Sequence, residues 1–172
     1  MTPEKVMSWP SVEIINSRND IQCLRAELDS LSADNDTIER AMCRFLVIRS
    51  CGYIELCVER GLLDTLAYEA SPSVLSYVES GFFKGRNPKP GKIDSLLRSF
   101  RVEWAEEVAD LLGKDDELLK RELEFLVSKR NSIAHGQSDS LGRRKALDLC
   151  DYAIMIGDGI LEILMPQKVK PV

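Results

Sequence analysis

Apolar residues recur at intervals of three and four along almost every long segment of this chain, and this spacing restricts the fold more than any other feature. It is typical of amphipathic helices, because residues three and four apart lie on one helical face. The alternation of apolar and polar residues that a half-buried strand needs is not sustained over a strand's length. The pattern therefore predicts an all-α protein.

Caps, glycines and prolines divide this pattern into the expected helices. Apolar residues on most faces of the segment that begins at Asp36 indicate a central helix, which Gly61 breaks or bends. Asp115 or Asp116 is expected to cap the penultimate long helix, and Gly136 to end it. Residues 83–92 carry four positive charges and no negative one, and are expected to form an exposed loop. The predicted helices cover residues 12–31, 36–61, 62–69, 72–82, 93–112, 116–136 and 143–165.

Length and composition suit one soluble globular domain, since 172 residues with 44% hydrophobic and 30% charged residues are enough to bury an ordinary core. A net charge of −5 argues against a protein that coats nucleic acid without specificity. The first residues do not resemble a signal peptide, and charged residues interrupt the most apolar stretch, residues 153–165. We therefore expect a cytoplasmic chain that does not enter a membrane.

The five cysteines are an odd number, contain no Cys-x-x-Cys pair and lie mostly at apolar helical positions. We interpret them as reduced core residues. A structural zinc site is not expected, because the spacing is wrong and the chain has a single histidine. We expect no metal site and no cofactor.

That histidine, His135, follows Arg130 by five residues near the end of a predicted helix. Because imidazole titrates near neutral pH, proton transfer falls to His135 or to a carboxylate, lysine or cysteine with a strongly shifted pKa. The guanidinium of Arg130 is permanently charged and can hold phosphoryl oxygens through two parallel hydrogen bonds. The pair indicates chemistry at a phosphate.

Helical geometry does not by itself bring Arg130 and His135 together, because residues five apart lie about 140° around the axis. Asn131 and His135, four apart, share a face. Arg130 and His135 meet at one phosphate if the arginine curls round, if the helix end unwinds or if a second subunit supplies a facing pair. The alternative is structural, since a histidine in a last helical turn is stabilised by the helix dipole and caps free carbonyls.

Other catalytic motifs do not account for the chain. The segment from Gly85 to Lys92 lacks the glycine spacing, the hydroxyl residue and the preceding strand of a phosphate-binding P-loop. No Gly-x-Ser-x-Gly nucleophile motif occurs. The adjacent carboxylate pairs, at residues 106–107 and 115–116, are most simply helix-surface or capping residues.

Near the end of the penultimate long helix, the chain has Arg130, then Asn131, a short spacer and His135. This order, in a small all-α chain, resembles the signature of the HEPN superfamily. Residues 53–55 (Tyr-Ile-Glu), Asn87 with Pro88, and residues 93–100 are similar to the RiboL-PSP-type branch of that superfamily. The resemblance covers roughly residues 38–165. It implies a single-domain helical bundle of the HEPN type in residues 36–172, with residues 1–35 adding an N-terminal helix that packs on the bundle.

The resemblance also implies a function, because many HEPN proteins are metal-independent endoribonucleases of toxin–antitoxin and antiviral defence systems that act as homodimers. By that analogy His135 transfers the proton as a ribose 2′-hydroxyl attacks the adjacent phosphate, and Arg130 stabilises the charge that develops. Asn131 orients one of these groups or the phosphate. Glu55 positions Arg130, or else is a solvated glutamate on a helix face. Some HEPN toxins have a modifiable tyrosine two residues after the histidine, but this chain has Gln137 there.

The expected partners are RNA, a second copy of the chain, and an antitoxin or defence-system protein. The alternative function is that of a non-catalytic HEPN-type module that binds RNA, a nucleotide or a partner protein, which suits the acidic net charge. Basic residues form an RNA track only if they converge in space, and are otherwise scattered solvated charges. The candidates for RNA contact are Lys84, Arg86, Lys89, Lys92, Lys129, Arg143, Arg144 and Lys145.

Overall fold

The computed structural model describes residues 9–32, 36–81, 87–137 and 141–166, and these residues form six helices and no strand. The prediction of an all-α fold is confirmed. The helices are α1 (Val12–Ser30), α2 (Asp36–Glu69), α3 (Pro72–Gly81), α4 (Pro90–Arg98), α5 (Val102–Ala134) and α6 (Arg143–Leu164).

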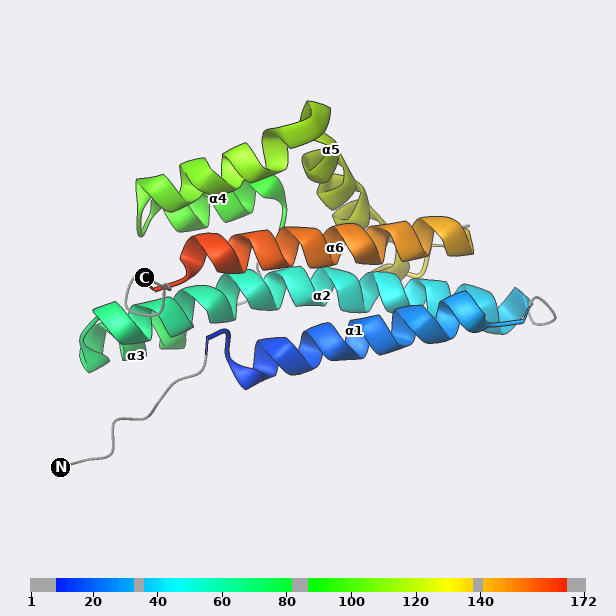
Figure 1. The fold of residues 1–172 in the computed structure, drawn as a ribbon, viewed down its shortest axis with the longest axis horizontal. Coiled ribbons are helices and arrows are strands. Elements are labelled where there is room, and N and C mark those ends of the chain that lie inside the picture. The colour runs from blue at the N-terminus through cyan, green and yellow to red at the C-terminus, as the bar shows by residue number, and fades with distance from the viewer. Residues whose placement is uncertain (1–8, 33–35, 82–86, 138–140, 167–172) are drawn as a thin grey trace.

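Helix α2 is the centre of the bundle. It packs against α1, α3, α5 and α6, and the helices α1, α2 and α6 run side by side along the long axis of the molecule (Figure 1). Helix α4 packs against α5, and α5 in turn packs against α6. The central place expected for the segment after Asp36 is thus confirmed, because residues on several faces of α2 are buried.

The break expected at Gly61 is wrong, since α2 continues through it to Glu69. Gly61 is buried and faces α6, where an added Cβ atom would lie 3.1 Å from Leu161 Cδ2. The glycine therefore allows two helices to approach closely and does not bend its own helix.

The single helix expected over residues 93–112 is also wrong. Helix α4 already starts at Pro90, inside the expected loop, and ends at Arg98. The amides of Phe100 and Arg101 both bond to the carbonyl oxygen of Leu97, and Arg101 then adopts an extended backbone before α5 begins. Arg101 is held there by its ion pair with Glu69 and by the Trp104 ring, 4.2 Å from its guanidinium carbon. The apolar spacing continues across this turn, so spacing alone does not reveal it.

The interruption expected after residue 113 is present as a kink within α5, where residues 114–117 have non-helical backbone angles. Asp115 and Asp116 were expected as caps, but their φ values of 50° and 55° place them in the left-handed region. They form the turn itself and do not adopt the extended conformation of an N-cap residue. Aspartate tolerates this region better than most residues with a Cβ atom.

Four of the five cysteines are buried free thiols, as expected: Cys43, Cys51, Cys57 and Cys150. Cys23 is exposed, so the interpretation of all five as core residues is wrong for this one. Burial raises the pKa of Cys51 and of Cys57 to about 12, and both stay protonated at neutral pH.

The close approach of α6 to α2 at Gly157 predicts a strong effect on stability. An added Cβ atom there would lie 2.5 Å from Cε1 of the buried Tyr53, whose hydroxyl donates to Asp158 Oδ1 at 3.0 Å. We expect Gly157→Ala to lower the free energy of unfolding by about 1–3 kcal/mol, as overpacking of a core does. The control is Gly52→Ala, at an exposed position with no atom within 4 Å, which should raise it by up to about 1 kcal/mol. If urea denaturation shows the same change in the free energy of unfolding for both variants, the close contact of α6 with α2 at Gly157 is contradicted.

Candidate functional site

The predicted motif occupies the last turns of α5. Arg130 and Asn131 lie within the helix and His135 is its C-cap residue, with an exposed side chain. The amide of His135 still bonds to the carbonyl oxygen of Asn131 at 3.0 Å, and Gly136 then turns the chain with a φ of 70°. A positive φ of this kind is what glycine provides after a helix, so the predicted end of the helix is confirmed.

Arg130 belongs to a polar cluster that joins three parts of the chain. Its Nη1 donates to Asn131 Oδ1 at 3.3 Å, and Nδ2 of Asn87, just before α4, donates to the same oxygen at 3.1 Å. Arg130 Nη2 lies 3.9 Å from Glu55 Oε1 on α2. Glu55 is thus placed where it can position Arg130.

The Glu55 carboxyl is half-buried in this cluster. Burial raises the pKa of Glu55, and the positive charge of Arg130 counteracts that rise. The two side chains are also partly exposed, 27% for Glu55 and 37% for Arg130, so water weakens their attraction. Arg130 is held in place by a modest electrostatic pair and by the Asn131 amide.

Removal of Arg130 should make stability more dependent on pH. In Arg130→Ala the pKa of Glu55 in the folded protein rises further above its pKa in the unfolded chain. The variant therefore loses stability as the pH increases from the unfolded pKa to the folded pKa of Glu55. We expect the variant to lose up to about 1 kcal/mol at pH 7 and less at pH 4. Urea denaturation at the two pH values measures this difference.

The control for this prediction removes the carboxylate. In the double variant Glu55→Gln with Arg130→Ala, the additional loss at pH 7 should disappear, because the glutamine cannot ionise. Two results would show that Glu55 does not interact with Arg130. One is an equal loss of unfolding free energy at both pH values in the single variant, and the other is a double variant that depends on pH as strongly as the single variant does.

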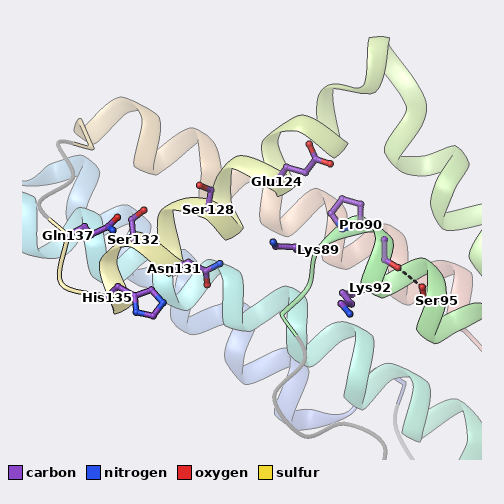
Figure 2. Close-up of a pocket in the computed structure, with 11 residues that line it drawn as sticks. Lys89, Pro90, Lys92, Ser95, Glu124, Ser128, Asn131, Ser132, His135 and Gln137 are labelled. Carbon is purple, nitrogen blue, oxygen red and sulfur yellow. Dashed lines mark hydrogen bonds between the residues drawn. The ribbon is translucent and has the colours of Figure 1, made fainter.

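A pocket of about 680 Å³ opens beside the motif. One wall is the exposed face of α5, and the opposite wall is formed by residues 89–92 and Ser95 at the start of α4 (Figure 2). The side chains of Lys89 and Lys92 lie across the pocket from Asn131 and His135 (Figure 2). The residues of the α5 wall are Glu124, Ser128, Asn131, Ser132 and His135.

The α4 side of the pocket is electropositive. Lys89 and Lys92 are exposed, and neither forms an ion pair within the part of the chain that the structure describes. The N-terminus of α4, with Pro90 in its first turn, adds the positive end of a helix dipole. A phosphate group is the kind of ligand that this side favours.

The other RNA candidates among the described residues have partners elsewhere in the protein. Arg143 pairs with Glu39 of α2 and donates to the carbonyl oxygen of Leu31, which ties α6 to the α1–α2 end of the bundle. The lining of the pocket does not include Arg143, Arg144, Lys145 or Lys129. Arg144 pairs with Asp148, Lys145 with Glu122 at 2.6 Å, and the amino group of Lys129 lies 5.1 Å from the centre of the Phe125 ring. Lys84 and Arg86 lie outside the described residues.

Arg130 and His135 of one chain do not share a single environment. His135 lines the pocket, whereas Arg130 is directed to Glu55 and does not line it. Asn131 connects the two, because its side chain contacts Arg130 and also lines the pocket. This division agrees with the angle of about 140° expected between residues five apart on a helix.

Sequence reasoning did not identify Glu124, Ser128 and Ser132 as pocket residues. These residues lie four apart, and together with Asn131 and His135 they form one polar stripe along α5. The signal was their four-residue spacing, which continues the helical face of Asn131 and His135 towards the N-terminus of the same helix. The contact of Asn87 with Asn131 had no such signal, because the two residues are far apart in the chain.

Comparison with known families identifies the domain. The family model RiboL-PSP-HEPN matches residues 13–165. The chain belongs to this family. The match begins within α1, and the division of this HEPN chain at residue 35 stays a prediction. Searches of curated proteins and of solved structures gave no match.

HEPN domains often bind RNA, dimerise and act as ribonucleases. Among the described helices of this HEPN domain, none combines the length and the hydrophobicity needed to span a bilayer. Within residues 9–32, 36–81, 87–137 and 141–166, no group of three or more His, Cys, Asp and Glu side chains is placed to hold a metal ion.

Proposed function

We propose that this HEPN domain is a metal-independent endoribonuclease of a toxin or defence system. The observation that supports it most is the position of His135 and Asn131 on a pocket that also carries two exposed lysines, which have no ion-pair partner among the described residues. An imidazole supplies acid–base chemistry near neutral pH, and the lysines attract a polyanion. Membership of the HEPN family adds support, because HEPN modules are often ribonucleases.

The proposed reaction uses the substrate's own hydroxyl as nucleophile. His135 accepts the proton of a ribose 2′-hydroxyl, whose oxygen then attacks the adjacent phosphorus. The bond from phosphorus to the 5′-oxygen breaks, and that oxygen takes a proton from a general acid. The products are a 2′,3′-cyclic phosphate and a 5′-hydroxyl.

Arg130 stabilises the negative charge on the phosphorane-like transition state. Its guanidinium is held by Asn131, which Asn87 holds in turn, and its Nη2 lies 3.9 Å from Glu55 Oε1. We assign Asn131, Asn87 and Glu55 as positioning residues on these contacts. Such support matters because a misplaced charge loses much of its effect on the transition state.

Lys89 and Lys92 are the proposed contacts to RNA phosphates, because they face His135 across the pocket without a carboxylate partner among the described residues. Arg143, Arg144 and Lys129 are weaker candidates, since each has a partner within the protein. The acidic net charge is then compatible with RNA binding at one local positive site.

The active form is proposed to be a homodimer in which two motifs face one cleft. One chain supplies a single imidazole, whereas cleavage benefits from both a base and an acid. The division of Arg130 and His135 between two environments in one chain also favours a site completed by a second copy.

The dimer predicts how activity depends on protein concentration. We expect light scattering to give twice the mass of the chain, and activity per chain to fall on dilution in parallel with dissociation. The His135→Ala variant serves as a control, because it should dimerise normally without cleaving RNA. A monomer with full activity per chain would refute the dimeric site.

The direct test of the function is incubation of the purified protein with single-stranded RNA in EDTA, followed by identification of the product ends. Cleavage with 2′,3′-cyclic phosphate ends supports the proposal. RNA binding without cleavage, under conditions where the protein is folded and dimeric, would instead favour the non-catalytic HEPN module.

A further inference from the structure

The proposed chemistry leaves one part of the pocket unexplained. Glu124, Ser128 and Ser132 line it along α5, and no hydrogen bond or ion pair engages their side chains within the described part of the chain. Three polar groups in a row on one wall of a cavity offer hydrogen bonds to a ligand. The cleavage mechanism itself uses none of them.

The pocket is large enough for more than a phosphate. Its volume of about 680 Å³ lies within the range of sites that hold small organic ligands. Along the axis of α5, Glu124 and Asn131 are about 10 Å apart at 1.5 Å per residue. This separation is comparable to the distance from a nucleotide's phosphate to the far edge of its base.

Opposite charges line the two walls of the pocket. Lys89 and Lys92 on the α4 side favour a phosphate, whereas the carboxylate of Glu124 repels one. A nucleotide therefore places its phosphate near the lysines and a group with N–H donors near Glu124. A carboxylate only accepts hydrogen bonds when ionised, so it selects for donors.

Guanine is the base that best meets this requirement. Its Watson–Crick edge carries two adjacent N–H donors, which can bond to both oxygens of one carboxylate. Adenine and cytosine offer an amino group next to a ring acceptor, and uracil offers one N–H between two carbonyl oxygens. Paired, charge-assisted hydrogen bonds of this kind are the strong ones.

We propose that this pocket is a nucleotide subsite that selects guanine through Glu124, with Lys89 and Lys92 binding the phosphate and Ser128 contacting the base or ribose. The position of this guanine next to the cleaved bond rests on the proposed ribonuclease function. The binding of a guanine nucleotide does not, because it depends only on groups in the pocket.

The first experiment measures binding of the four nucleoside 3′,5′-bisphosphates by calorimetry. We expect the guanosine compound to bind roughly 10-fold more tightly than the uridine compound, the size of effect that one bidentate base contact gives. Glu124→Gln should remove this preference. Lys89→Ala and Lys92→Ala should lower the affinity for all four compounds equally and leave the preference for guanosine intact.

The matched control is Glu103→Gln, which removes a carboxylate from an exposed position on the same helix outside the pocket. It should bind the four compounds as the unaltered protein does. Equal affinities for all four compounds, or a preference for guanosine that survives Glu124→Gln, would overturn the subsite.

Cleavage of an RNA with a randomised stretch separates this inference from the proposed function. A guanine preference at one position beside the cut, lost in Glu124→Gln, supports both. If the RNA is cleaved but Glu124→Gln changes no base preference, the subsite is overturned and the ribonuclease function is not. Guanosine-selective binding by a protein that cleaves no RNA supports the subsite and overturns the ribonuclease.

Discussion

Replacement of His135 by alanine is expected to lower the rate of RNA cleavage by about 10²–10⁴-fold, the usual cost of losing a positioned acid–base group. The fold should change little, because the side chain is exposed at the end of α5. Single-turnover cleavage rates and thermal unfolding measure the two effects separately.

The control for His135→Ala is Asn19→Ala, which removes an exposed side chain of α1 that does not line this pocket and carries no titratable group. It should cleave RNA within a few-fold of the unaltered rate. A folded His135→Ala protein that cleaves RNA normally would show that the histidine is only a helix cap, the structural role that its position also allows.

Deoxyribose in place of the ribose on the 5′ side of the cut is expected to abolish cleavage at that site, whereas EDTA should have no effect. The nucleophile of the proposed reaction is the 2′-hydroxyl, and a substrate without it has no atom to attack the phosphorus. The loss should be complete within the sensitivity of the assay, because neither Arg130 nor His135 can supply this nucleophile.

The substrate control carries deoxyribose on the 3′ side of the cut, where the hydroxyl takes no part in the reaction. It should be cleaved at a rate close to that of the all-ribose RNA. Cleavage of the 5′-side deoxy substrate, or a strict requirement for magnesium, would exclude the mechanism and leave the binding subsite to be judged by the bisphosphate titration.

The all-α fold and the placement of the motif were accessible from the sequence. The three- and four-residue spacing reports which side of a helix is buried, and it identified α2 as central because apolar residues surround it. Gly136 marked the end of α5 because its positive φ is a local property of glycine. The angle between Arg130 and His135 also followed from helical geometry alone.

Other features depended on contacts that local patterns do not report. Gly61 has the composition of a helix break, yet α2 continues because that glycine is needed where Leu161 of α6 approaches. The turn after Arg98 lies inside an unbroken apolar spacing, and Arg101 is held there by Glu69, a residue from another helix. Local signals of this kind give way to tertiary packing when the two disagree.

Local periodicity and helix-ending residues were enough to predict a helical bundle with an arginine, an asparagine and a histidine at one helix end. Packing between helices brings Glu55 to Arg130 and Asn87 to Asn131, and it places Lys89 and Lys92 across a pocket from His135. The physical reason is that spacing places a residue around the axis of its own helix. Which helices meet at that face depends on how the whole core packs.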